Sequence, residues 1–241
     1  MTRLDALRTA PLVDALMEIV PRNHREPDQI WHRRRRIVAG TVLVGAGLLE
    51  RSLAAEPDSR QFYVRSLSVA GAWLAGGFGS GPLHLGRQWG RGQALRRPLV
   101  TPVATGVAAF GAFYCCALVV REIPVLERAI SSVLDYADEG STPLVLLTTL
   151  ANGAAEEVFF RGALYAAVGE GRPVVLSTAA YTATTLATKN PALVLAAIVM
   201  GTLFGMQRRA SGGIQAPVLT HLTWSALMLR FLPPLFRHPA D

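Results

Sequence analysis

Long apolar stretches, separated by short polar segments, recur along the whole chain. A helix needs roughly 20 mostly apolar residues to cross a hydrocarbon layer about 30 Å thick. Seven stretches approach that length, and the fifth and sixth are short enough to require tilting or a break that is buried in protein. They cover residues 37–55, 62–80, 98–120, 143–169, 173–188, 191–206 and 214–235. The pattern predicts an all-α protein, a polytopic membrane helix bundle with about seven transmembrane helices.

Two amphipathic segments accompany these stretches. Residues 121–142 place apolar side chains on one side of a helix, which is typical of a connector at the membrane interface. Residues 4–20, broken by Pro11, either lie on the cytoplasmic surface or form a tail without fixed structure. The chain therefore divides into four predicted parts. These are a cytoplasmic N-terminal segment (1–36), three N-terminal transmembrane helices (37–120), the interfacial connector (121–142) and a four-helix core (143–235).

Composition and charge placement favour a membrane protein. Hydrophobic residues make up 51% of the chain and charged residues only 17%, which is too apolar for an ordinary soluble domain. The net charge of +7 raises the question of nucleic acid. The arginines lie between the apolar stretches, however, and no other segment is long enough to form a basic domain. We therefore expect no nucleic-acid partner.

The arginines also predict the topology. If the N-terminus is cytoplasmic, the loops that carry most of the arginines all lie inside, as the positive-inside rule requires. These arginines are within residues 33–36 and 87–97, at 172 and at 208–209. We expect a multi-pass integral protein of the bacterial plasma membrane, surrounded by the lipid bilayer, with its N-terminus cytoplasmic.

Candidate chemistry is concentrated in the fourth apolar stretch, where Glu156, Glu157 and Arg161 stand within six residues. Each charge costs roughly 2.5 to 3.5 kcal/mol near a membrane centre, so the three should face the bundle interior and compensate one another. Glu157 and Arg161 are four residues apart on one helix face and suit an ion pair. Glu156 has no partner on its own helix, and such a carboxylate can take a proton from water. The alternative is a buried polar clasp that only fixes helix packing.

A second group lies on the last apolar stretch, where His221 and Ser225 are four residues apart and face the same way. A rise of about 1.5 Å per residue puts Glu156 roughly 18 Å and Ser225 roughly 16 Å from the inner ends of their helices, so these groups can meet in one cavity. His221 is the only histidine in residues 143–235. A catalytic zinc takes more nitrogen or sulfur ligands than this, so we expect neither a metal nor a cofactor.

These motifs resemble those of the CPBP family, the CAAX proteases and bacteriocin-processing, Abi-type intramembrane proteases that include the type II CAAX prenyl protease. EEVFFR, residues 156–161, is similar to the family's EExxxR motif, and HLTWS, residues 221–225, to its HxxxN/S-like motif. The resemblance covers residues 143–235.

The resemblance implies a proteolytic cavity within the membrane. Glu156 would activate water, Glu157 and Arg161 would complete its motif and hold its geometry, and His221 would orient the water or support the oxyanion. Ser225 stands where the family often has asparagine. The family's middle motif, FxxxH, matches YTATT, residues 181–185, in which Thr185 replaces the histidine. A threonine hydroxyl can hold a water but lacks the basicity of an imidazole.

Three functions remain open on these residues. The leading hypothesis is an intramembrane glutamate-dependent endopeptidase that acts on a membrane-tethered or amphipathic peptide or protein. The second is a catalytically inactive relative that serves as a membrane scaffold, an immunity protein or a partner in a membrane-protein complex, and Thr185 favours it. The third is a transporter or proton relay, which intramembrane carboxylates permit but which no paired broken helices support.

Overall fold

The computed structural model describes residues 11–22, 24, 26–89, 94–169 and 171–236. The described chain is all-α apart from one antiparallel pair of two-residue strands, β1 (Gln88–Trp89) and β2 (Leu95–Arg96). The all-α prediction is therefore confirmed. Part of the predicted N-terminal amphipathic stretch, residues 4–10, lies outside the described residues, and the remainder contains the short helix α2 (Pro11–Met17).

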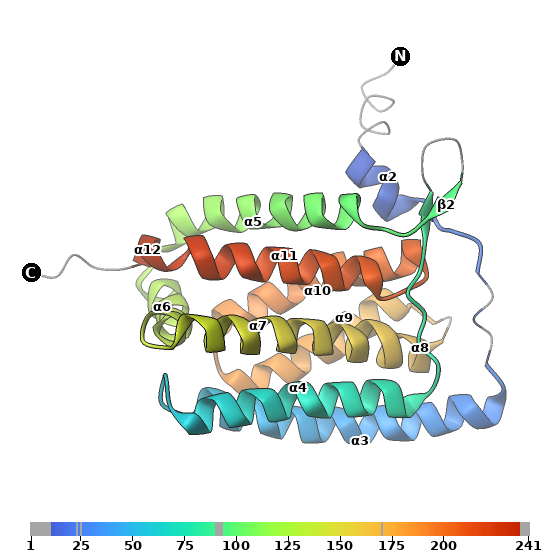
Figure 1. Cartoon of the computed structure of the whole chain (residues 1–241), viewed down its shortest axis with the longest axis horizontal. Helices are drawn as coiled ribbons and strands as arrows, with labels where there is room; N and C mark the ends of the chain where they lie inside the picture. Colours follow the sequence, from blue (N-terminus) through green and yellow to red (C-terminus); the bar gives the residue numbers. More distant parts are fainter. Residues whose placement is uncertain (1–10, 23, 25, 90–93, 170, 237–241) are drawn as a thin grey trace, which may run out of the picture.

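Each of the seven apolar stretches lies in a helical segment. The first three are α3 (Asp28–Leu53), α4 (Arg60–Ser80) and α5 (Val100–Val120). The fourth contains α7 (Thr142–Glu156), which continues through the π-helix η2 (Glu157–Leu164) into α8 (Tyr165–Val168). The last three are α9 (Pro173–Thr185) with the 3₁₀ turn η3 (Leu186–Thr188), α10 (Pro191–Ser211) and α11 (Gln215–Phe231). Figure 1 shows the long helices side by side along the long axis of the molecule.

The connector also forms a helix, α6 (Pro124–Asp138), at the left-hand end of the bundle in Figure 1, and α12 (Pro233–Phe236) follows α11. Several helices begin at proline, which fits the first turn because its missing N–H has no partner there. Among them are α6, α9 and α10. The side chain of Asn190 caps α10 by accepting hydrogen bonds from the backbone N–H groups of Ala192 and Leu193.

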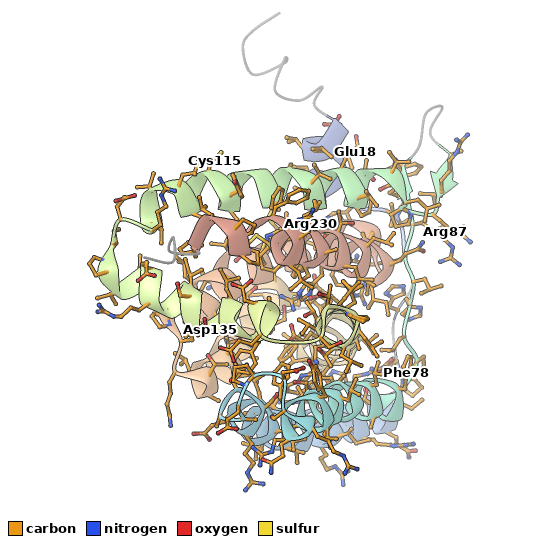
Figure 2. All side chains as sticks on the ribbon, turned by 60° about the vertical axis from the view of Figure 1, so that its left-hand side comes forward. Glu18, Phe78, Arg87, Cys115, Asp135 and Arg230 are labelled. Carbon is orange, nitrogen blue, oxygen red and sulfur yellow. The ribbon has the colours of Figure 1, made fainter. Side chains whose placement is uncertain are left out.

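By length and hydropathy together, two described helices qualify as candidate membrane spans, α5 and α10. The other long helices carry charge or are interrupted. α3 includes four consecutive arginines, Arg33 to Arg36, and the π-helix ends α7 at Glu156. Several large apolar side chains nevertheless point outward, among them Leu43 (76% exposed) and Val100 (80%). Figure 2 shows Phe78 and Cys115, also exposed, at the periphery of the bundle.

An aromatic core fixes η2 against α4. Trp73 on α4 is buried and packs on Phe159 and Phe160, with ring centroids 4.8 and 5.0 Å apart. The indole also lies against Gly45 on α3, where an added Cβ would stand 2.0 Å from the ring. Because every residue of η2 is buried, its polar side chains must find their partners inside the bundle.

Candidate active site

Four of the six predicted site residues border one cavity of about 270 Å³. Its walls come from both halves of the chain and include α3, α4, α7, α9, α10 and α11. Glu156, Thr185, His221 and Ser225 all line it. Glu157 and Arg161 do not line the cavity but lie behind its wall, and both side chains are fully buried. The structure therefore brings all six predicted residues into one region, four at the surface of the cavity and two beneath it.

Glu156 is held from a neighbouring helix. The hydroxyl of Tyr181 on α9 donates a hydrogen bond to Glu156 Oε2 across 2.6 Å. This O–H···O contact is at the short end of the range for such hydrogen bonds. The contact fixes the orientation of the carboxylate, which borders the cavity at the end of α7.

Glu157 joins two parts of the site. Its Oε1 atom lies 3.3 Å from Arg161 Nη1, the ion pair predicted from their spacing, and 2.9 Å from His221 Nδ1 on α11. Because this oxygen also accepts from Arg161, we assign the Nδ1 N–H of His221 as a donor to it, which leaves Nε2 as the ring nitrogen that Glu157 does not hold. Glu157 thus sets the orientation of the His221 ring.

Close packing holds the imidazole. Its ring stacks on Phe204 of α10, with centroids 4.7 Å apart and an interplanar angle of 22°. Gly153 of α7 also lies close to the ring, where an added Cβ would stand 3.3 Å from Cδ2 and 3.4 Å from Nε2. Gly153 also lines the cavity, so the nitrogen that Glu157 does not hold lies beside this wall. His221 and Glu156 thus border the same cavity.

Arg161 is enclosed by aromatic rings and backbone carbonyls. Its guanidinium lies 4.6 Å from the ring centroid of Tyr181 and 5.3 Å from that of Phe204. Nη2 donates to the carbonyl of Gly201 at 3.0 Å, a close approach that the absent side chain of this glycine permits. The buried positive charge therefore has both a counter-charge in Glu157 and cation–π partners.

Thr185 lies at the cavity, but its hydroxyl is bonded to its own helix. It lines the cavity, and its hydroxyl donates to the carbonyl of Tyr181 at 2.9 Å, one turn earlier on its own helix. Threonines in helices commonly bond their backbone in this way. The hydroxyl proton is therefore committed to the helix, while its oxygen can still accept.

The sequence analysis missed two polar groups of this site. It treated Tyr181 only as a substitute for phenylalanine, although a tyrosine in an apolar helix needs a partner for its hydroxyl. Asn152 also lines the cavity; its amide nitrogen donates to the carbonyls of Ser66 and Thr148, and its Oδ1 is buried with no partner among the described residues. The described residues contain no cluster of three or more His, Cys, Asp or Glu suited to a metal ion.

A comparison with protein-family models tests the resemblance to the CPBP family. Residues 138–227 match the family described as type II CAAX prenyl endopeptidase Rce1-like. This region is a domain of that family. The Rce1-like domain runs from the end of α6 into α11 and contains all six predicted site residues. No curated protein and no solved structure matches the chain.

Proposed function

We propose that the Rce1-like domain is a glutamate-dependent endopeptidase that works inside the membrane on a membrane-tethered or amphipathic peptide or protein. One observation carries the proposal: Glu156 and His221 border a common cavity while Glu157 holds the imidazole from behind. A carboxylate base and an oriented imidazole that border one cavity are the parts that water activation needs.

In the proposed reaction, Glu156 removes a proton from water and the resulting hydroxide attacks the peptide carbonyl carbon. The oxyanion that forms is stabilised by His221, with the Ser225 hydroxyl as a second donor. Collapse of this intermediate breaks the C–N bond, and the proton held by Glu156 passes to the departing amine. Tyr181 keeps the carboxylate in place, and Glu157 with Arg161 fixes the imidazole.

We also propose that the whole chain is a seven-span bundle of the plasma membrane with its N-terminus in the cytoplasm. In this division, three N-terminal helices (37–120) and the interfacial connector (121–142) support a four-helix catalytic core (143–235). The outward apolar side chains of the long helices support a lipid environment. Arg172, Arg208 and Arg209 line one cavity together with Trp31, near the start of α3, which carries Arg33 to Arg36, and this placement supports the orientation.

Replacement of the proposed base tests the activity. The purified full chain, reconstituted in vesicles, would be given a panel of lipid-anchored peptides carrying a fluorophore and a quencher. Loss of a general base costs about 10²- to 10⁴-fold in rate, so Glu156→Gln should cleave at least 100-fold more slowly than the natural chain. Glu139→Gln, on an exposed carboxylate outside the cavity, should leave the rate unchanged. Equal rates in Glu156→Gln and the natural chain would refute the proposal.

One observation favours the second candidate, a catalytically inactive relative that acts as a scaffold, an immunity protein or a binding partner in the membrane. Thr185 stands in place of the motif histidine, and its proton is committed to the Tyr181 carbonyl. Thr185→Ser serves as the matched control for Thr185→His, because it keeps the hydroxyl. Cleavage that occurs only after Thr185→His would assign the natural chain to this second function.

A further inference from the structure

A second and larger cavity opens at the other end of the bundle from α6. It measures about 1140 Å³ and is bounded by the segment before α3 and by the ends of α8, α9 and α10. In Figure 1 this is the right-hand end, where the segment between α2 and α3 runs down the side of the bundle. None of its lining residues borders the candidate active site. The proposed peptidase gives it no role.

The charge of this cavity is strongly unbalanced. Its described lining residues include four arginines and a single carboxylate, Glu26. Glu26 is already occupied, because both of its oxygens accept hydrogen bonds from Arg34. The arginines are Arg22, Arg172, Arg208 and Arg209. No ion pair among the described residues involves any of them.

Arg208 is the least expected of these cations, because its residue is only 4% exposed. Its Nε donates to the carbonyl of Arg161 at 2.7 Å, and its guanidinium lies 5.0 Å from the ring centroid of Tyr165. The Tyr165 hydroxyl is itself buried and has no hydrogen-bond partner among the described residues. A buried charge without a counter-charge is costly, so an anion at this position would compensate a cost that the described residues leave uncompensated.

We propose that this cavity binds a phosphate group, carried either by a phospholipid headgroup or by a soluble phosphate. Guanidinium groups match phosphate oxygens in charge and geometry and bind them through paired hydrogen bonds. The volume exceeds that of an isolated phosphate and leaves room for the remainder of a headgroup. Trp31, Val174 and Val175 add apolar wall to the same cavity, which suits an amphiphilic ligand.

His24 provides a reporter inside the cavity. Its ring stacks on His84, with centroids 3.6 Å apart and an interplanar angle of 3°. Burial lowers the pKa of His24 to about 4, and the neighbouring His84, Arg208 and Arg22 add to that effect while Glu26 opposes it. A bound phosphate would neutralise the arginine charges, so the pKa of His24 should rise when the site is occupied.

The test measures binding to the purified full chain in an uncharged detergent. The ligands are inorganic phosphate against chloride at equal ionic strength, and short-chain phosphatidylglycerol against the diacylglycerol of the same chain length. The readouts are the thermal midpoint Tm and the His24 titration followed by NMR. The variants are Arg208→Gln and Arg172→Gln, with Arg60→Gln as a control of equal charge change, because Arg60 is exposed at the opposite end of the bundle.

A phosphate-bearing ligand should raise both Tm and the His24 pKa in the natural chain and in Arg60→Gln. Binding should weaken about tenfold or more in Arg208→Gln, as expected for a charge-assisted contact, and less in Arg172→Gln, whose side chain is exposed. A response to inorganic phosphate assigns a soluble ligand, and a response only to phosphatidylglycerol assigns the lipid. If Arg208→Gln does not fold, Arg172→Gln and the His24 titration of the natural chain still test the proposal.

Several results would overturn the proposal. One is the absence of any change in Tm or in the His24 titration with either phosphate compound. Another is equal binding of the diacylglycerol and the phosphatidylglycerol, or a loss in Arg60→Gln as large as that in Arg172→Gln. Tight binding of a peptide rich in carboxylates, without binding of phosphate, would assign the cavity to a different partner.

Discussion

At the scale of single residues, Glu157 connects the histidine of the site to the buried arginine. One oxygen of its carboxylate accepts from both His221 and Arg161, so any change there affects two helices at once. The i,i+4 spacing predicted the contact with Arg161. The contact with His221 spans 64 residues of sequence, and no local pattern can reveal a pairing that the fold alone creates.

The buried pair should make Glu157→Gln strongly destabilising. The amide keeps the size of the side chain but leaves Arg161 without a counter-charge, which costs about 3 to 5 kcal/mol in a buried site. Glu157→Gln combined with Arg161→Met should recover much of that loss, because no buried charge remains. Denaturant unfolding in detergent measures both. A loss below about 1 kcal/mol in the single variant would contradict the assigned pairing.

The imidazole has little room to move, which leads to a second prediction. In Gly153→Ala the new Cβ would stand 3.3 Å from a ring that also stacks on Phe204, so the ring would have to shift by a few tenths of an ångström. Displacement of a group that acts on the reacting atoms lowers the rate, so peptide cleavage should fall. Gly71→Ala is the control, because an added Cβ there meets nothing within 4 Å. Equal rates in the two variants would contradict the described packing.

At the scale of elements, the π-helix η2 is the feature that the sequence least reveals. The apolar stretch 143–169 predicted one regular helix, and the chain is indeed helical from Thr142 to Val168, but the wider turn begins directly at Glu157. Single π-helical turns are rare and often mark functional sites. They depend on tertiary packing, here that of Phe159 and Phe160 against Trp73, so apolar periodicity gives no signal for them.

The segment before α3 should make stability depend on pH. His24 has its pKa lowered to about 4, whereas an unfolded histidine titrates near 6.5. Between these values the unfolded chain binds the proton more readily. The contribution of neutral His24 to the free energy of unfolding is therefore fully present above about pH 6.5 and is lost as the pH falls toward 4. Tm in His24→Asn should fall less over this range than in the natural chain. The exposed His32→Asn is the control, and equal slopes in both variants would refute the assignment.

At the scale of the whole molecule, the apolar stretches located the helices well because burial in a bundle and exposure to lipid both require apolar surface. The ends of helices that carry charged residues were harder to predict. α3 begins at Asp28, inside the segment predicted as N-terminal and cytoplasmic, since arginines are good helix formers. The family resemblance is confirmed for residues 138–227, while the division of the chain into parts and the seven-span topology stay predictions.

Membrane insertion can be tested with the two cysteines. Cys115 and Cys116 are exposed on α5, so in water they would react with a charged maleimide. In lipid the hydrocarbon layer should exclude the reagent, and labelling in vesicles should appear only after the protein is denatured. The maleimide should react with a cysteine introduced by Glu139→Cys, beyond the end of α6, when it is added to the side of the membrane on which residue 139 lies. Rapid labelling of the native cysteines in intact vesicles would contradict a span at α5.

The central claim is that Glu156 and His221 act together on one water, and a double-variant rate measurement tests it most directly. Cleavage of the lipid-anchored peptides would be compared among the natural chain, Glu156→Gln, His221→Asn and the double variant. Groups that act as a unit show non-additive losses, so the double variant should be no slower than the slower single variant. Single variants as fast as the natural chain, or losses that multiply independently, would contradict the account.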